Sequence, residues 1–441
     1  MSYLTDRRRF LQATALTGVG VFVADASAAP ASKSANEQLR FACIGVGGKG
    51  RSDSADALRH GDVVAICDVD DNTLAKAGDK SFPKAARYSD FRKMLDEVGK
   101  NVDGVTVSIP DHMHAAATAQ ALRMGIACYT QKPLTRTIWE ARQLGEIARE
   151  AKVATQMGNQ GTSFPPLRRT AKALHAGVIG NVREVHVWTN RPHWACGCPR
   201  PAEGKVPPNL HWDLWLGTAP ERPYAPGYHP HSWRGWWDFG SGALGDMACH
   251  TVNMPFMALD LRDPTSVQAT TSGHNRDSYP KWSIIKFEFP ANDQRPAVAM
   301  TWYDGGQKPD AELFDNEPVS KTGALLIGDK GKLFAKGDYA EWGYTLLGGA
   351  ENVEVEIDRP VYHFTEFANA IKGGPQATSN FPDYAGPLTE TILLGNLAVW
   401  AAPESETPGK KIEWDAQNLK PTNAPEVEVV VKPEYSDGYV L

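Results

Sequence analysis

"FACIGVGGKGR", residues 41–51, decides the fold, because an apolar run of strand length passes directly into a tight glycine turn. Gly45, Gly47 and Gly50 have the spacing G-x-G-x-x-G. The first glycine of such a motif permits the turn, the second lets the backbone approach a pyrophosphate, and the third lets helix pack on strand. The helix N-terminus then faces the phosphates with unpaired N–H groups. The stretch therefore predicts a dinucleotide site in a βαβ unit.

An acidic residue ends the next expected strand, about twenty residues further along the chain. The segment "AICDVDDN" supplies Asp68 at this position. A carboxylate there accepts a hydrogen bond from a ribose 2′-hydroxyl and repels a 2′-phosphate, so it favours NAD over NADP. The alternative interpretation is a glycine turn with a capping aspartate in an unrelated α/β protein.

Apolar strands and helices alternate as far as residue 158. Strand-length runs such as "DVVAICDVD" and "VDGVTVSIP" are separated by helical segments such as "NTLAKAGDKS", "DHMHAAATAQALRMG" and "YSDFRKMLDEV", the last with Ser89 as its expected cap. This alternation is typical of a parallel sheet covered on both faces, with right-handed crossovers. We therefore predict that residues 39–158 form an N-terminal Rossmann domain, a doubly wound parallel sheet.

The pattern changes after residue 158 to strands in which apolar and polar residues alternate. Examples are "PTSVQATTSG", "WSIIKFEFPA", "AVAMTWYD" and "GALLIGDKGKLFAKG", and helical segments follow near residues 361–372 and 385–401. Alternation of this kind indicates an antiparallel sheet with one open face. We predict that residues 159–441 form a C-terminal α+β domain with a large, mostly antiparallel open sheet.

The N-terminus has the features of an export signal. Arg7 and Arg8 are followed by Phe10 and Leu11 as in R-R-x-F-L, and the sequence Ala-Ser-Ala at residues 26–28 suits cleavage. The apolar stretch between them is short for a bilayer span. We predict a twin-arginine signal peptide at residues 1–28, a linker at 29–38, and a periplasmic or extracytoplasmic protein without stable membrane insertion after cleavage. A membrane anchor or a chance basic N-terminus is the alternative.

Composition narrows the classes of partner. The net charge of the 441 residues is −6, with no basic run beyond the N-terminus, so we expect no nucleic acid. Of six cysteines, Cys196 and Cys198 stand apart as C-G-C. A metal pair, a strained disulfide and two free thiols all remain open for them, but no second cysteine cluster supports zinc, so we predict no metal.

Further motifs resemble those of the Gfo/Idh/MocA oxidoreductase family across nearly all of the chain after the signal. They are "SIPDHMH" with Pro110 and His114, "QKPLT" with Lys132, and "GALGDMACH" with Asp246 and His250. The resemblance implies a sugar or cyclitol bound between the two domains over the nicotinamide, and a homo-oligomer through the C-terminal sheet. Family members usually have glutamate at the position of Gln131, whose amide can still bond a ribose. The resemblance thus places Pro110, His114, Gln131 and Lys132 at the cofactor.

The same residues suit proton transfer on chemical grounds. Lys132 follows a parallel strand at its carboxyl end, where open α/β sheets bind ligands. Asp246 and His250 are spaced i, i+4, so they share one helix face. We interpret His250 as the proton acceptor, Lys132 as polariser and proton relay, and Asp246 as their partner, although the first two roles can be exchanged. A surface lysine, and an N-cap aspartate with a core histidine, are the alternatives.

A tract rich in tryptophan, proline and glycine, residues 192–243, supplies the candidates for sugar binding. Indole faces suit the C–H edges of a sugar, and charged neighbours bind its hydroxyls. The candidates are Arg191, Trp194, Trp233, Arg234, Trp236 and Trp237. Tryptophans are also common core residues, so we expect only two or three of the four to touch substrate.

Export and a dinucleotide site together restrict the function. An exported dehydrogenase has no cytoplasmic pool in which to exchange its cofactor, so we expect NAD to be tightly bound and not to dissociate. A redox-neutral reaction needs no further partner. The chain also resembles the exported NAD-dependent glycosidases of this family, which oxidise a sugar at C3, eliminate the aglycone, add water and return the hydride. The resemblance therefore predicts a redox-neutral glycoside hydrolase. A sugar or cyclitol dehydrogenase with tightly bound NAD is the alternative, and a non-catalytic sugar-binding protein a third.

Overall fold

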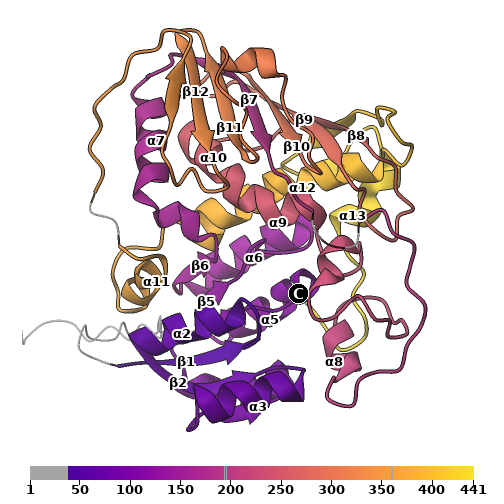
Figure 1. The fold of residues 1–441 in the computed structure, drawn as a ribbon. Helices are drawn as coiled ribbons and strands as arrows, with labels where there is room; N and C mark the ends of the chain where they lie inside the picture. The colour runs from indigo at the N-terminus through magenta and orange to yellow at the C-terminus, as the bar shows by residue number, and fades with distance from the viewer. Residues whose placement is uncertain (1–37, 193, 195, 359–360) are drawn as a thin grey trace, which may run out of the picture. The chain divides into compact units, whose positions relative to one another are not determined.

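Among the residues that the structure describes, the first sheet has six parallel strands. The computed structural model describes residues 38–192, 194, 196–358 and 361–441, so the predicted signal and the linker up to residue 37 lie outside the described residues. The strands of the first sheet are β1 (Leu39–Ile44), β2 (Gly61–Cys67), β3 (Ala86–Tyr88), β4 (Gly104–Val107), β5 (Ala127–Thr130) and β6 (Thr155–Met157). Their order is β3-β2-β1-β4-β5-β6 (Figure 1). The chain reverses its direction of travel between β1 and β4, which opens a crevice at their carboxyl ends. The predicted Rossmann sheet is confirmed.

Helices connect these strands, and their first turns explain where they begin. They are α2 (Gly50–His60), α3 (Asp71–Lys80), α4 (Phe91–Val98), α5 (Asp111–Arg123) and α6 (Ile138–Ala151). Thr137 and Glu140 form a reciprocal capping box at α6. The sequence predicts Ser89 as the cap of α4, and this prediction is wrong by one residue, because the cap is Asp90. Asp90 accepts from the Arg92 N–H at 2.9 Å, because its carboxylate outcompetes the Ser89 hydroxyl, which turns to Asp71 instead.

In the described part of the chain, the second sheet has nine strands, and neighbouring strands are antiparallel except for β7 and β10. The strands are β7 (Val182–Trp188), β8 (Ser266–Thr271), β9 (Ser283–Phe289), β10 (Val298–Tyr303), β11 (Gly323–Gly328), β12 (Gly331–Lys336), β13 (Thr345–Leu347), β14 (Ile412–Asp415) and β15 (Lys420–Pro421). Their order is β13-β12-β11-β7-β10-β9-β8-β14-β15. The predicted mostly antiparallel sheet is confirmed, and the segment "GALLIGDKGKLFAKG" forms the hairpin of β11 and β12.

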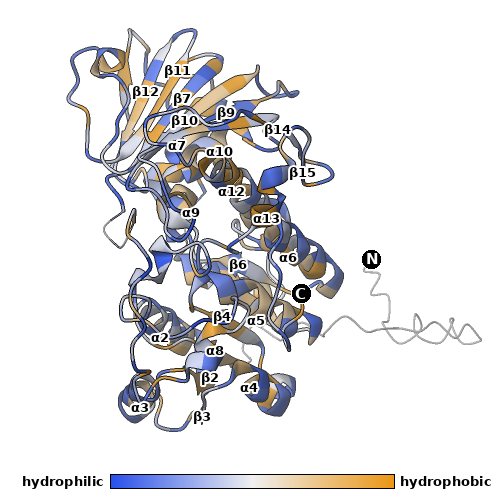
Figure 2. Cartoon of the chain, turned by 90° about the vertical axis from the view of Figure 1, so that its right-hand side faces the viewer, coloured by the Kyte–Doolittle hydropathy of each residue, from blue (hydrophilic) through white to orange (hydrophobic). Residues whose placement is uncertain are grey.

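Helices cover one face of this sheet. They are α7 (Pro165–His175), α9 (Gly242–Thr251), α10 (Asn253–Leu259) and α12 (Gly386–Trp400). Strand β9 shows the reason: Ile285 and Phe287 point into the core, whereas Lys286 and Glu288 are exposed on the opposite face. The hydrophobic colour of α12 beneath the strands is visible in Figure 2.

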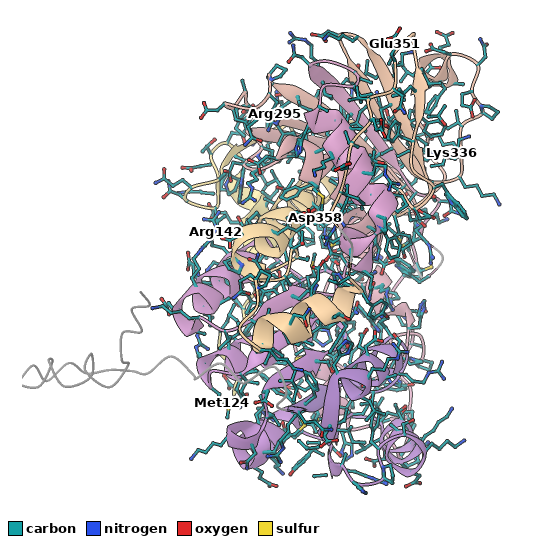
Figure 3. All side chains as sticks on the ribbon, turned by 90° about the vertical axis from the view of Figure 1, so that its left-hand side faces the viewer. Met124, Arg142, Arg295, Lys336, Glu351 and Asp358 are labelled. Carbon is teal, nitrogen blue, oxygen red and sulfur yellow. The ribbon has the colours of Figure 1, made fainter. Side chains whose placement is uncertain are left out.

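Two helices from the second half of the chain also pack on the first domain. Helix α11 (His363–Ile371) lies beside α2 (Figure 1), and the Phe364 ring lies 4.9 Å from that of Tyr129 on β5. Helix α12 contacts α6, where Arg142, labelled in Figure 3, donates to both carboxylate oxygens of Glu390 at 2.9 and 2.6 Å. Residues beyond 158 therefore complete the cover of the Rossmann sheet as well as forming the second sheet.

The tryptophan-rich tract folds over the carboxyl ends of the first sheet. Its short helix α8 (Trp212–Leu216) belongs to an aromatic cluster in which the rings of Trp212 and Trp215 stack at 4.8 Å. His112 holds this cluster to α5, with Nε2 2.9 Å from the Trp215 carbonyl oxygen. In the described part of the chain, no helix has the length and apolar character needed to cross a bilayer.

Candidate active site

The glycine turn has the geometry that only glycine allows. Gly45 has a φ of 78°, and a Cβ there would lie well inside contact distance of the Ser108 carbonyl oxygen. A Cβ on Gly50 would collide with the Gly45 carbonyl oxygen. Gly47 and Gly48 present backbone to a large cavity, and α2 begins two residues after Gly48, at Gly50. The N-terminus of α2 is thus directed at that cavity, as a phosphate site requires.

Asp68 stands beside this turn at the end of β2. One carboxylate oxygen accepts from the Val46 N–H at 3.0 Å and the other from the Asp70 N–H at 3.0 Å. Burial raises the pKa of Asp68, and these hydrogen bonds oppose that shift. The carboxylate lines the cavity and keeps lone pairs for further donors, so it suits ribose hydroxyls.

The cavity is continuous from the glycine turn to the predicted catalytic residues. Its volume is about 690 Å³, and its walls come from the ends of β1, β2, β4 and β5, from α9 and from the tryptophan-rich tract. The predicted residues that line it are Gly45, Gly47, Asp68, Pro110, Gln131, Lys132, Arg191, Trp233, Arg234, Asp246 and His250. One end is a glycine cradle with a ribose acceptor, and the other is a cluster of titratable groups. The residues therefore fit a dinucleotide.

An ion cluster forms the floor of the second end. The Lys132 ammonium donates to the Asp246 carbonyl and carboxylate oxygens, both at 2.8 Å, and Arg234 Nε reaches the same carboxylate oxygen at 3.3 Å. Burial alone would raise the pKa of Asp246, but Lys132 and Arg234 hold it well below its usual range. The carboxylate therefore stays ionised and fixes the ammonium in the cavity.

His250 lies one helical turn beyond Asp246 and is 4% exposed. Burial and the nearby Lys132 lower its pKa well below the ordinary value, so the imidazole is neutral. Its Nδ1 is buried and has no hydrogen-bond partner among the described residues, while the Tyr339 ring packs against it at 4.6 Å. A neutral imidazole with an unpaired buried nitrogen beside a cavity is suited to accept a proton from a bound ligand.

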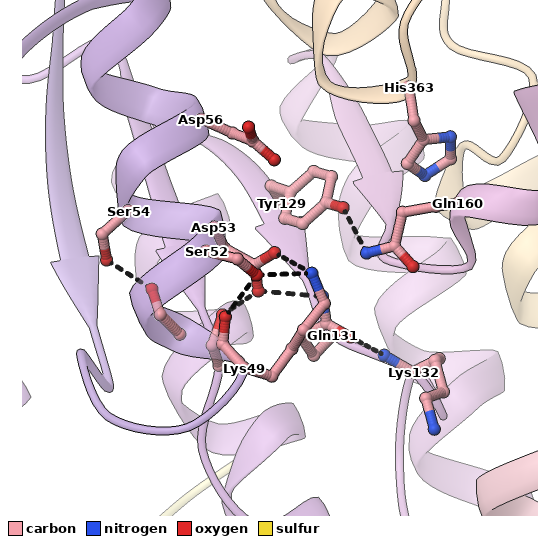
Figure 4. A network of polar contacts seen from close by, with 12 residues as sticks. Lys49, Ser52, Asp53, Ser54, Asp56, Tyr129, Gln131, Lys132, Gln160 and His363 are labelled. Atoms are coloured by element: carbon pink, nitrogen blue, oxygen red, sulfur yellow. Dashed lines mark hydrogen bonds and ion pairs between the residues drawn. The ribbon is translucent and has the colours of Figure 1, made fainter.

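A buried carboxylate explains why residue 131 is glutamine. Asp53 on α2 accepts from Lys49 Nζ at 2.6 Å and from Gln131 Nε2 at 2.8 Å (Figure 4). It also accepts from Ser108 Oγ at 2.8 Å. The side-chain amide oxygen of Gln131, Oε1, accepts from the Lys132 N–H at 3.3 Å. A glutamate at 131 would oppose the Asp53 carboxylate, whereas the amide bridges Asp53 to the lysine loop.

Several cavity residues were missed by the sequence analysis. Asp111 opens α5, accepts from Ser241 Oγ at 2.6 Å, and has its pKa raised to about 7 by burial. Its place in the quoted "SIPDHMH" is a usable signal, but only Pro110 and His114 are named from that stretch in the sequence analysis. Tyr339, His229 and His231 also line the cavity, and Tyr339 follows β12 in a segment without any recognisable motif.

Some predicted residues do not line the cavity. The ring nitrogens of His114 lie 2.8 Å from the Ile109 and Pro133 carbonyl oxygens, so this side chain joins the loops after β4 and β5. Trp236 and Trp237 are buried, and Trp237 stacks on Tyr279 at 3.9 Å. The remaining residues outside the lining are Gly50, within the turn, and Trp194, whose ring meets the edge of His231.

The two cysteines of the C-G-C segment are free thiols in the structure. Cys198 Sγ lies 3.6 Å from the Cys196 carbonyl oxygen, and Cys196 is buried. Within the described ranges, no group of three His, Cys, Asp or Glu side chains is placed to hold a metal ion.

Comparison with known proteins gives two family matches. Residues 39–159 match "Oxidoreductase family, NAD-binding Rossmann fold", and residues 168–372 match "Oxidoreductase family, C-terminal alpha/beta domain". Levoglucosan dehydrogenase of Pseudarthrobacter phenanthrenivorans is 25% identical over 315 residues, which are 70% of this chain and 58% of that protein. The chain spans about half the length of the curated relatives it matches, at 50%, 58% and 49% for three of them.

Solved structures share the fold. The WlbA dehydrogenase from Bordetella pertussis, crystallised with NADH and UDP-GlcNAcA, has a TM-score of 0.59 at 17% identity, covering 85% of this chain and 98% of that one. The aldose-aldose oxidoreductase from Caulobacter crescentus, complexed with glycerol, has a TM-score of 0.59 at 16% identity, covering 85% of this chain and 100% of that one. At these identities the likeness shows the two-domain fold.

Proposed function

This chain belongs to the Gfo/Idh/MocA oxidoreductase family, and from that premise we propose that it transfers hydride between NAD and a carbon of a sugar. The observation that carries the proposal is the single cavity that runs from the glycine turn to Lys132, Asp246 and His250. The 25% identical levoglucosan dehydrogenase supports a sugar as the substrate class.

Each residue has a part that follows from its contacts. Gly45, Gly47 and Asp68 would hold NAD, which supplies a hydride acceptor and donor when bound. Neutral His250 accepts the proton of the sugar hydroxyl as hydride leaves the same carbon. Lys132, fixed by Asp246, donates a hydrogen bond to the oxygen that becomes a carbonyl.

We further propose that the net reaction is redox-neutral hydrolysis of a glycoside. Oxidation at C3 acidifies the C2–H bond, a base takes the C2 proton, and the C1–O bond to the aglycone breaks as the leaving oxygen gains a proton. Water then adds at C1, the proton returns to C2, and hydride returns to C3. This sequence needs acid and base groups beyond the hydride step, and Asp111 and His231 line the same cavity. Burial raises the pKa of Asp111 to about 7, which suits a group that both gives and takes protons.

Export of the protein, which is itself part of this proposal, favours the same net reaction. The predicted twin-arginine signal at residues 1–28 would export the folded protein with NAD already bound, away from the cytoplasmic pool. A cofactor that is reduced and reoxidised within one turnover needs no exchange. Assembly into a homo-oligomer through the nine-stranded sheet is a further part of this proposal.

A panel of nitrophenyl glycosides, offered to the purified protein in D₂O without added cofactor, tests the proposal. Release of nitrophenol with deuterium at C2 of the sugar, detected by proton NMR, supports redox-neutral hydrolysis. A ketone product with one equivalent of reduced cofactor favours the alternative, a sugar dehydrogenase. Hydrolysis with full protium at C2 would contradict the elimination mechanism.

A further inference from the structure

The last ten residues of the chain return to the cofactor domain. After α13 (Glu428–Val431), the Tyr435 hydroxyl donates to Glu140 Oε1 on α6 at 2.6 Å. Ser436 donates two hydrogen bonds to the loop that follows α8. The Ser436 N–H donates to the Thr218 carbonyl oxygen at 3.3 Å, and the Ser436 hydroxyl donates to the Ala219 carbonyl oxygen at 2.5 Å. The C-terminus is drawn beside α5 in both Figure 1 and Figure 2. The tail is therefore anchored across the Rossmann domain.

Tyr439 is the tail residue that reaches the cavity. It is half-buried and lines the cavity together with Ser89, Asp90 and Phe91, at the junction of β3 and α4. The Arg92 guanidinium lies 4.7 Å from the centroid of its ring. Asp90 holds that guanidinium through hydrogen bonds of 3.0 and 2.8 Å. The ring thus has a fixed place, supported from behind by a cation–π contact.

The strand order identifies which half of a dinucleotide would lie there. The Rossmann sheet runs β3-β2-β1-β4-β5-β6, with the glycine turn after β1 and Lys132 after β5. A dinucleotide whose pyrophosphate lies at the turn and whose reacting end lies at Lys132 extends its other half toward β2 and β3. Asp68 follows β2 and Ser89 follows β3. This end of the cavity therefore faces the adenosine half.

We propose that Tyr439 forms the adenosine-binding wall of the NAD site, and that the tail of residues 435–441 straps the cofactor in place. The inference rests on the proposed function, because it takes NAD as the occupant of the cavity. An aromatic ring offers a base a flat apolar surface, and base–aromatic contacts contribute enough that loss of the ring weakens binding roughly 10- to 100-fold. A wall supplied by a tail that is anchored elsewhere would also slow release.

The test compares Tyr439→Ala and Tyr439→Leu with wild type and with Val440→Ala. Val440 is in the same tail but is 78% exposed and outside the cavity lining, so it controls for disturbance of the tail. NAD retained after dialysis of the full chain is measured first. Affinities for AMP and for nicotinamide mononucleotide then follow from calorimetry. Thermal unfolding shows whether each variant is folded, and the leucine variant keeps side-chain volume if the alanine variant is unstable.

We expect both Tyr439 variants to lose NAD on dialysis and to bind AMP roughly 10- to 100-fold more weakly, with the affinity for nicotinamide mononucleotide unchanged. Val440→Ala should behave as wild type. Folded Tyr439 variants that retain NAD and bind AMP normally would overturn this inference alone. Equal weakening of both nucleotides would also overturn it, because the effect would then not be local to the adenosine end. Wild type that binds none of the three nucleotides would overturn the proposed function itself.

Discussion

Replacing Asp246 by asparagine removes one negative charge from the centre of the ion cluster while keeping the side-chain shape. The Asp246 carboxylate is 12% exposed, and its partners Lys132 and Arg234 are 17% and 23% exposed. Removing one member of a buried pair costs about 3–5 kcal/mol because the partner stays buried without its countercharge. Some water reaches both cations here, so we expect the free energy of unfolding to fall by about 3 kcal/mol. Because Lys132 loses its fixed position, kcat should fall at least ~10²-fold.

Glu390→Gln is the matched control for this substitution. Glu390 pairs with Arg142 through two hydrogen bonds, the side chains are 15% and 27% exposed, and the pair lies outside the 690 Å³ cavity. Urea unfolding and steady-state kinetics are measured for both variants. We expect comparable losses of stability but a loss of kcat only for Asp246→Asn. If Asp246→Asn kept more than about a tenth of the wild-type kcat, or if both variants lost kcat equally, the assigned role of the cluster would be wrong.

The pKa of Asp246 is depressed from its ordinary 3.8, so the stability that its ionised carboxylate adds to the fold is present above about pH 4 and is lost only as the pH falls through the folded-state value. The stability advantage of wild type over Asp246→Asn, measured by urea titration, should therefore be constant from pH 5 to 8. A steady decline of that advantage across this range would contradict the assignment. Lys132→Ala and His250→Ala should each lower kcat by ~10²-fold or more while bound NAD, measured after denaturation, stays at the wild-type level. Asp68→Ala should weaken NAD and relax discrimination against NADP in equilibrium binding, and an unchanged preference would mean that another residue reads the ribose. Burial lowers the pKa of His363 from 6.5 to about 4, so protons bind preferentially to the unfolded chain. This group therefore lowers stability by about 3 kcal/mol in full as the pH drops from 6.5 toward 4, and His363→Gln should make that part of the stability profile less steep by this amount in urea titrations.

Features encoded by local spacing could be predicted from the sequence. The glycine turn, the strand–helix alternation and the i, i+4 pair of Asp246 and His250 depend on residues within a few positions of one another. Lys132 was found because a residue after a parallel strand reaches the binding edge of the sheet. The cap of α4 failed at the same local scale, because Ser89 and Asp90 are both good caps and only packing decides between them.

Contacts between distant segments could not be predicted in this way. Tyr439 meets Arg92, Asp53 meets Gln131, and Tyr339 meets His250 only after the chain has folded, and no local pattern marks these pairs. Tryptophan posed a different problem, because the large apolar ring that suits a sugar also suits a core. Trp233 lines the cavity while Trp236, three residues away, is buried in the aromatic cluster.

Transfer of deuterium from sugar to cofactor tests most directly whether hydride moves within this cavity. The purified protein is mixed in a single turnover with an accepted glycoside that carries deuterium at C3, quenched at short times, and its nicotinamide cofactor is analysed by mass spectrometry. We predict a transient fraction of reduced cofactor that carries one deuterium, and slower turnover than with the unlabelled glycoside. Full turnover with no label on the cofactor at any time, and no difference in rate, would contradict hydride transfer from C3.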